Sequence, residues 1–148
     1  APVMIRGSEG MAVQFAHCCR PIPGDPIIGL ISKGQGMVIH THNCPAIAKT
    51  RSDPDKVIDV EWAPETKKLF NVNIKLVVIN QRGVLAKVAS AIAGADSNID
   101  NVAVDPEQGD QYATMHFTLQ VFNRLHLAQI MRVLRSIPEV VRIARVNH

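Results

Sequence analysis

Residues 70–88 have the sequence FNVNIKLVVINQRGVLAKV, in which the hydrophobic period changes once. Apolar residues occupy every second position from Phe70 to Val78, which is the period of a β-strand with one buried face. After the break at Asn80–Gly83 the apolar spacing becomes three and four residues, which predicts a helix from Val84. We expect its buried face to contain Val84, Leu85, Val88, Ala89, Ile92 and Ala93.

The rest of the C-terminal half continues this alternation of strand and helix. We predict strands over residues 99–104, 113–121 and 139–146, and a helix over 124–136 that ends before Pro138. Residues 105–110 contain Pro and Gly and predict a hairpin loop. The order β-α-β-β-α-β predicts a ferredoxin-like domain, with both helices on one face of a four-stranded antiparallel sheet. Val77 and Ile79 would then lie on the open face, either as an ordinary apolar patch or as a homodimer surface through the sheet.

The N-terminal half is less regular and predicts a small α/β module. Strands are expected over residues 11–16, 27–31, 37–40 and 57–62, with a glycine turn over 33–36 and a short helix capped by Asn43. The polar stretch 59–68 contains Pro64 and predicts a domain boundary, so we expect domains over 1–66 and 67–148 in an α+β chain. Formal charge also changes there: six basic and seven acidic residues precede residue 67, and ten basic and six acidic residues follow it.

Composition restricts the class of protein. The chain has 148 residues, and 47% of them are hydrophobic, so a packed core is expected. No apolar run is long enough for a transmembrane helix, no signal peptide is recognisable, and the chain does not begin with Met, which suggests a fragment of a longer protein. A net charge of +3 with one Trp, one Tyr and four Phe disfavours a base-stacking nucleic-acid binder. Three cysteines, two of them adjacent, indicate a reducing cytoplasm.

The main constellation of reactive residues is Cys18-Cys19 followed by His40 and Cys44. Thiols and imidazoles are preferred zinc ligands, so one hypothesis is a structural zinc site. The other hypotheses are buried thiols that pack as small hydrophobic groups, and a reactive or redox-sensing thiol. Adjacent strand residues point to opposite faces, so Cys18 and Cys19 can bind one ion only if a loop turns them together. A cysteine of this constellation paired with a histidine could act as nucleophile and base, but no third group that would orient the histidine is recognisable, so catalysis is not expected.

A second candidate site is the turn Asn80-Gln81-Arg82-Gly83 before the first long helix. Helix N-termini attract anions such as the carboxylate of an amino acid, and Gly83 permits close approach to the backbone. The alternative is an ordinary strand-to-helix turn.

Four arginines near the C-terminus form a third candidate. They would contact RNA phosphates or form a solvated surface, and they are Arg132, Arg135, Arg142 and Arg145.

These motifs carry a family resemblance. AHCCRPIPGD at residues 16–25, GQG at 34–36 and VIHTHNC at 38–44 resemble the conserved-cysteine, zinc-finger-like (RIS) module of long RelA/SpoT proteins, which make and hydrolyse (p)ppGpp in the stringent response. The β-α-β-β-α-β half resembles the ACT domain that ends those proteins, with good agreement at residues 124–135 and 138–143. The character of the last helix is closer to the SpoT branch.

The resemblance implies that Cys18, Cys19, His40 and Cys44 are the metal-ligand positions. It implies a regulatory fragment whose parent chain carries, upstream, a manganese-dependent hydrolase domain and a magnesium-dependent synthetase domain. Partners implied by it are the catalytic half of that chain, regulatory proteins, ribosome or tRNA, and branched-chain amino acids, with no membrane. Asn43 and Asn80 stand where the family commonly has an acidic residue, so roles that need that charge are not transferred.

Overall fold

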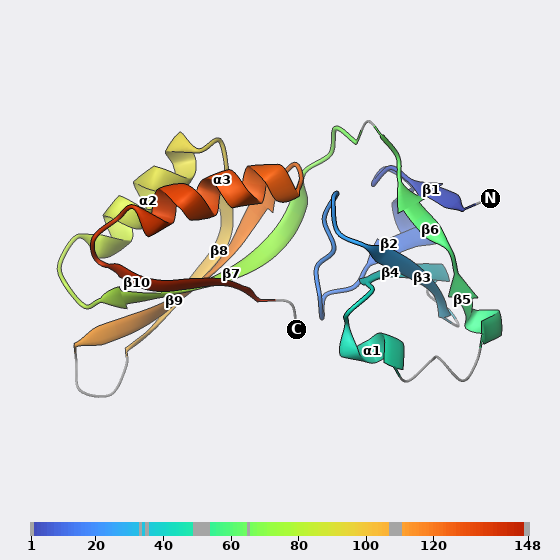
Figure 1. Cartoon of the computed structure of the whole chain (residues 1–148), viewed down its shortest axis with the longest axis horizontal. Helices are drawn as coiled ribbons and strands as arrows, with labels where there is room; N and C mark the ends of the chain where they lie inside the picture. Colours follow the sequence, from blue (N-terminus) through green and yellow to red (C-terminus); the bar gives the residue numbers. More distant parts are fainter. Residues whose placement is uncertain are drawn as a thin grey trace. The chain divides into compact units, whose positions relative to one another are not determined.

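The computed structural model describes residues 2–32, 34, 36–48, 54–64, 66–106 and 111–146. The chain divides into two compact units, residues 2–70 and 71–146 (Figure 1). Each unit is described separately below. Lys33, Gln35 and residues 107–110 lie outside the described residues, so the predicted turn over 33–36 and the predicted hairpin loop are only partly visible. None of the helices in the described part of the chain combines the length and the apolar character that a membrane span needs.

Unit 1 is built mainly from short strands in two sheets. The larger sheet has the order β2-β4-β3-β5, and a parallel pair, β1-β6, forms the smaller sheet. The strands are β1 (Val3–Ile5), β2 (Val13–Phe15), β3 (Ile27–Ser32), β4 (Gly36–Thr41), β5 (Val57–Ile58) and β6 (Val60–Trp62). The helices are α1 (Pro45–Ala48) and the 3₁₀ turns η1 (Gly10–Ala12) and η2 (Pro54–Lys56).

Three expectations for unit 1 need correction. The strand predicted over residues 57–62 is two strands in different sheets, because the backbone carbonyl of Asp59 accepts a bond from Val3 N (3.0 Å) and not from the larger sheet. The strand predicted over 11–16 is shorter, because residues 10–12 form the turn η1. Asn43 was expected to cap α1, but it precedes the first residue of α1 by two positions, and its side chain instead accepts a bond from the Thr41 hydroxyl (2.9 Å).

Unit 2 has the predicted order of elements. The sheet order is β10-β7-β9-β8, and Figure 1 shows both helices on one face of it. The elements are β7 (Phe70–Ile79), α2 (Val84–Gly94), β8 (Asn98–Pro106), β9 (Tyr112–Val121), α3 (Arg124–Arg135) and β10 (Val140–Val146). The α+β class is therefore confirmed, and each long element lies within a few residues of its predicted range.

The core of unit 2 lies between the helices and the sheet. It contains the alternating face of β7, the apolar face of β9, and one stripe from each helix: Val72, Ile74, Leu76, Val78, Met115, Phe117, Leu119, Val84, Val88, Ile92, Leu127, Ile130 and Leu134. Leu85 was predicted to belong to this core, but it is 41% exposed, and Ala93 is also exposed. The buried stripe of α2 is narrower than its hydrophobic pattern. Val77 and Ile79 are half-buried on the opposite face of β7.

Three aromatic rings pack together at the end of unit 1. Phe15 and Trp62 are stacked at 5.7 Å between centroids, and Phe70 contacts both edge-on, at 5.4 and 5.3 Å. Such geometries contribute about 0.5–1.5 kcal/mol per pair beyond burial. The indole Nε1 of Trp62 donates to the backbone carbonyl of Asp25 (3.0 Å). Trp62 is the single tryptophan of the chain, so its fluorescence reports on unit 1.

Gly36 provides a test of how closely β4 packs against the backbone of η1. Its φ is +72°, and a Cβ placed on it would lie 2.7 Å from the backbone oxygen of Ala12. We expect Gly36→Ala to lower the free energy of unfolding of unit 1 by about 2–4 kcal/mol, because conformational strain adds to a backbone clash. The measurement is urea unfolding followed by Trp62 emission.

Gly10→Ala is the matched control, since Gly10 also has a positive φ (+71°) but would place its Cβ in open space. It should cost only about 1 kcal/mol, the strain alone. Equal losses for the two variants would contradict the close approach at Gly36.

Candidate metal centre

A tight turn after β2 brings two adjacent cysteines to one side. Ala16 N donates to Ile39 O (2.9 Å), which fixes the end of β2 against β4. Arg20 N then donates back to Ala16 O (3.0 Å), and Arg20 has a φ of +45°. This left-handed residue reverses the chain directly after Cys19. The turn therefore solves the problem that adjacent strand residues face opposite ways.

The other two members come from the end of β4 and the start of α1. His40 belongs to β4, and Cys44 immediately precedes α1. Cys44 N donates to Thr41 O (3.1 Å), and Ile47 N donates to Cys44 O (3.0 Å), so the backbone on both sides of Cys44 is held. A four-residue spacing therefore places an imidazole and a thiol on the same side of this turn.

All four side chains converge. Their potential ligand atoms lie within 4.8 Å of one another, in the single cluster of this kind that the described residues contain. Cys18 Sγ lies 3.5 Å from both His40 Nδ1 and Cys44 Sγ, and Cys19 Sγ lies 3.9 Å from His40 Nδ1. The structure thus brings together all four residues that the sequence analysis grouped as candidate metal ligands.

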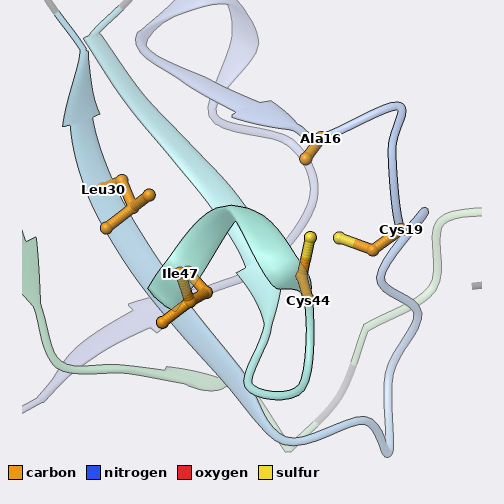
Figure 2. Close-up of a cluster of buried hydrophobic side chains, with 5 residues drawn as sticks. All are labelled: Ala16, Cys19, Leu30, Cys44 and Ile47. Carbon is orange, nitrogen blue, oxygen red and sulfur yellow. The ribbon is translucent and has the colours of Figure 1, made fainter. Parts of the chain in front are cut away.

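The cluster is backed by apolar side chains. Cys19 and Cys44 are 1% and 4% exposed and pack with Ala16, Leu30 and Ile47. Figure 2 shows their two sulfurs pointing toward one another beside α1. Cys18 as a residue is exposed, so the cluster lies at the margin of this core.

Electrostatics disfavour a reactive thiolate here. Burial, as the largest cause, acts together with the neighbouring Cys44 and Cys19 thiols to raise the pKa of the Cys18 thiol to about 12. Burial also raises the pKa of Cys19, opposed by the Thr41 backbone N–H, which donates to its sulfur (3.4 Å). Burial lowers the pKa of His40, which keeps the imidazole neutral. A nucleophilic or redox-sensing cysteine needs the opposite shift.

A tetrahedral metal ion fits the donor set. Zinc bonded to sulfur at about 2.3 Å separates its ligand atoms by about 3.8 Å, close to the distances between these side chains. A divalent cation also reverses the effect of burial, because it stabilises thiolates that are otherwise protonated. Three sulfurs and one nitrogen fill all four positions, so no position remains for a substrate. Closed sites of this kind stabilise folds and do not catalyse reactions.

The second predicted site is an exposed turn in unit 2. Asn80, Gln81, Arg82 and Gly83 are all exposed, and Gly83 has a φ of +86° at the N-cap of α2. Gly83 also lines a shallow hollow of about 620 Å³ between α2 and the segment that follows α3. The structure therefore leaves the turn accessible, and its role as a binding site stays a prediction.

The four predicted RNA-contacting arginines do not share one face. Arg132 and Arg135 are exposed on α3. Arg142 pairs with Val77 and so lies on the open face of the sheet, whereas Arg145 pairs with Ile74 and lies on the helix side. RNA contact by these residues stays a prediction.

Two residues that shape the metal cluster were not singled out from the sequence. Asp25 is buried, and its carboxylate accepts a bond from Ile22 N (2.8 Å), which closes the proline-rich loop after the cysteines. Thr41 supplies the N–H that points at Cys19. The Pro-x-Pro-Gly-Asp pattern was a signal for Asp25, whereas the contact of Thr41 depends on how β4 meets the loop.

Comparison with known proteins finds two family matches, one over most of unit 1 and one over most of unit 2. Residues 3–63 match the family model of the RelA/SpoT RIS domain, and residues 66–145 match that of the ACT domain. The chain is 40% identical over 141 residues to the bifunctional (p)ppGpp synthase/hydrolase SpoT of Escherichia coli K12, covering 95% of this chain and 20% of that protein. It is 31% identical over 145 residues to a GTP pyrophosphokinase of Streptomyces coelicolor, covering 98% of this chain and 17% of that one.

A solved structure also resembles the chain: the crystal structure of the ACT domain from the GTP pyrophosphokinase of Chlorobium tepidum. It is 23% identical with a TM-score of 0.46, and the match covers 52% of this chain and 97% of that one. The two domain matches define a RIS domain followed by an ACT domain. The chain belongs to the RelA/SpoT family, and it spans about one fifth of the length of the curated relatives named above.

Metal content tests the cluster. We expect protein purified without chelator to contain about one zinc ion per chain, and His40→Ala to reduce this to below about half, because three ligands hold the ion less tightly than four. Elemental analysis measures the content. Cobalt(II) in place of zinc should give the visible bands of a tetrahedral thiolate site.

His42→Ala is the matched control, since His42 is an exposed histidine two residues further on that does not belong to the cluster. It should retain the wild-type zinc content. Wild-type protein with far less than one zinc ion per chain would contradict the metal site.

Proposed function

We propose that the chain is the regulatory region of a longer bifunctional (p)ppGpp hydrolase/synthetase, and that it sets the balance between the two activities. The observation that carries this proposal is the 40% identity to SpoT over 95% of the chain, confined to one fifth of that enzyme. The hydrolase and synthetase domains, with their manganese and magnesium ions, would then lie elsewhere in the parent chain. The chain itself would catalyse neither reaction.

The chemistry of the metal cluster supports a structural role. A unit of about 70 residues has a marginal hydrophobic core, and a metal ion compensates for this in many small domains. Cys18, Cys19, His40 and Cys44 come from two separate segments of unit 1, so one ion links both. The zinc ion would hold unit 1 in the single shape that a regulatory contact needs. Free thiols at this position also suit a reducing cytoplasm.

The ACT domain has accessible surfaces through which a regulatory contact could be made. Its helices bury one face of the sheet, while the other face carries polar groups such as Asn73 and Thr118, joined by a 2.7 Å hydrogen bond, and half-buried Val77. A sheet with one free face and accessible helices can contact the catalytic half or a partner without unfolding. Control then requires only that such contacts differ between the hydrolysing and synthesising states.

The test compares the parent enzyme with and without these 148 residues. We expect removal to change the ratio of (p)ppGpp hydrolysis to synthesis by about tenfold, because a coupling free energy of 1–3 kcal/mol is typical of allosteric control. Both rates are measured by nucleotide chromatography with purified components.

Cys18→Ser in the full-length enzyme should shift the ratio in the same direction as removal, because it breaks the cluster without deleting the chain. Unchanged rates in both proteins would refute intramolecular control.

A second candidate function is binding of a branched-chain amino acid at the Asn80–Gly83 turn. Its support is the left-handed Gly83 at the exposed start of α2, where backbone N–H groups face a carboxylate without a side chain in between. We expect saturable heat on titration with valine or isoleucine, and its loss in Gly83→Val, because a β-branched side chain blocks that approach. No heat at millimolar amino acid would contradict it.

A further inference from the structure

The outer surface of the two helices in unit 2 combines a hollow with exposed apolar and basic groups. The N-terminal half of α2 and the segment after α3 enclose a hollow of about 620 Å³, lined by residues that include Gly83, Ala86, Lys87, Ser90, Ile137 and Pro138. Five of its eight lining residues are Gly, Ala or Ser. Small side chains allow another helix to approach closely, because the distance between packed helices depends on the side chains at the contact.

The helices run antiparallel beside this hollow. His126 in the first turn of α3 lies 2.8 Å, from its Nε2 atom, from the carbonyl of Ala95 at the end of α2. Val133, seven residues after His126, lies on the same side of α3, toward α2, and is 41% exposed. Val133 therefore adds an exposed apolar side chain on the side of α3 that faces α2.

The solvent-facing side of α3, called its crest below, carries the most exposed large apolar residue of the described part of the chain. Leu125 is 70% exposed, and Phe122 beside it is 43% exposed. Arg132 follows Leu125 by two helical turns and so lies on the same line of the helix. An exposed leucine and an arginine on one line of a solvent-facing helix favour a partner that offers apolar and acidic groups at helical spacing.

Charge selects among the partners. The sequences of α2 and α3 contain Lys87, Arg124, Arg132 and Arg135 and no acidic residue. Glu139 at the edge of the hollow pairs with Lys87 (2.5 Å), so Arg132 and Arg135 dominate the crest. A second copy of the same surface would oppose these arginines to themselves. RNA would satisfy them but would leave Leu125 and Phe122 without an apolar partner.

We propose that the helical surface of the ACT domain, defined here as the hollow together with the crest of α3, is the docking site of an acidic amphipathic helix from a separate protein. The apolar stripe of that helix lies along Val133 and Leu125, and its carboxylates face Arg132 and Arg135. This is helix-in-groove recognition, with anchors at helical spacing. It gives the proposed regulatory role a partner, and its binding is measured without any enzyme activity, so that the two proposals fail separately.

The probe is a fluorescein-labelled helical peptide of about 18 residues with leucines at i, i+4 spacing on one face and glutamates on the other. A scrambled peptide of the same composition is its control. Binding to the whole 148-residue chain is followed by fluorescence anisotropy. We expect saturable binding with a Kd on the order of 10–100 μM, weakened by salt.

Two variants of the crest and two matched variants elsewhere decide the location. Leu125→Gln and Arg132→Glu should each weaken binding by about tenfold. Val141→Gln, at an apolar residue of β10 that is 54% exposed, and Lys75→Glu, at an exposed lysine of β7, should change it by less than about twofold. Far-UV circular dichroism confirms that all four variants are folded.

Several results would overturn the proposal. These are equal binding of the scrambled peptide, equal losses in Arg132→Glu and Lys75→Glu, or the absence of saturable binding. Sedimentation that shows a dimer dissociated by Leu125→Gln would assign the surface to self-association. An RNA hairpin whose binding is lost in Arg132→Glu and kept in Leu125→Gln, with no peptide binding, would assign it to nucleic acid.

Discussion

Four side chains from two separate segments of unit 1 converge on one point, with their potential ligand atoms within 4.8 Å of one another. Cys18 and Cys19 reach that point only because the chain reverses at Arg20, and His40 and Cys44 reach it because β4 ends where α1 begins. The apolar residues behind them are few, since Ala16, Leu30 and Ile47 complete the buried cluster. The geometry of the thiols and the imidazole is therefore the constraint that orders the loop, the strand end and the short helix.

The two units solve the problem of stability differently. Unit 2 buries an extended face of β7 and β9 under two amphipathic helices, and this core needs no ion. Unit 1 has strands of two to six residues and lacks a long helix within the described residues. Its sheets are short, so its rigidity comes from specific contacts such as the Asp25 loop closure and the aromatic group of Phe15, Trp62 and Phe70. The two units therefore differ in how they are held together: unit 1 depends on individual contacts and unit 2 on an extended hydrophobic core.

The hydrophobic periodicity of the sequence predicted those elements whose structure depends on neighbouring residues in the chain. The alternation from Phe70 to Val78 is long and regular, so β7 was predicted within a residue of its observed end. The break at Asp59 could not be predicted, because it depends on pairing with β1, more than fifty residues earlier in the chain. Leu85 has the correct helical period, yet which side of a helix is covered depends on where the neighbouring elements lie. The metal cluster was predictable as a set of ligands, whereas its convergence required the left-handed turn.

Phe70 has a consequence for how such domains can be inherited. It is the first residue of β7, yet its ring belongs to the aromatic group of unit 1, and the space beside it is closed by Gly7. A recombination event between the two family matches, near residue 65, would carry Phe70 away with the ACT domain. Phe15 and Trp62 would then lose the edge of a ring and become exposed to water. Unit 1 therefore extends several residues beyond its last strand, and a gene fusion that retains residue 70 would keep its aromatic group complete.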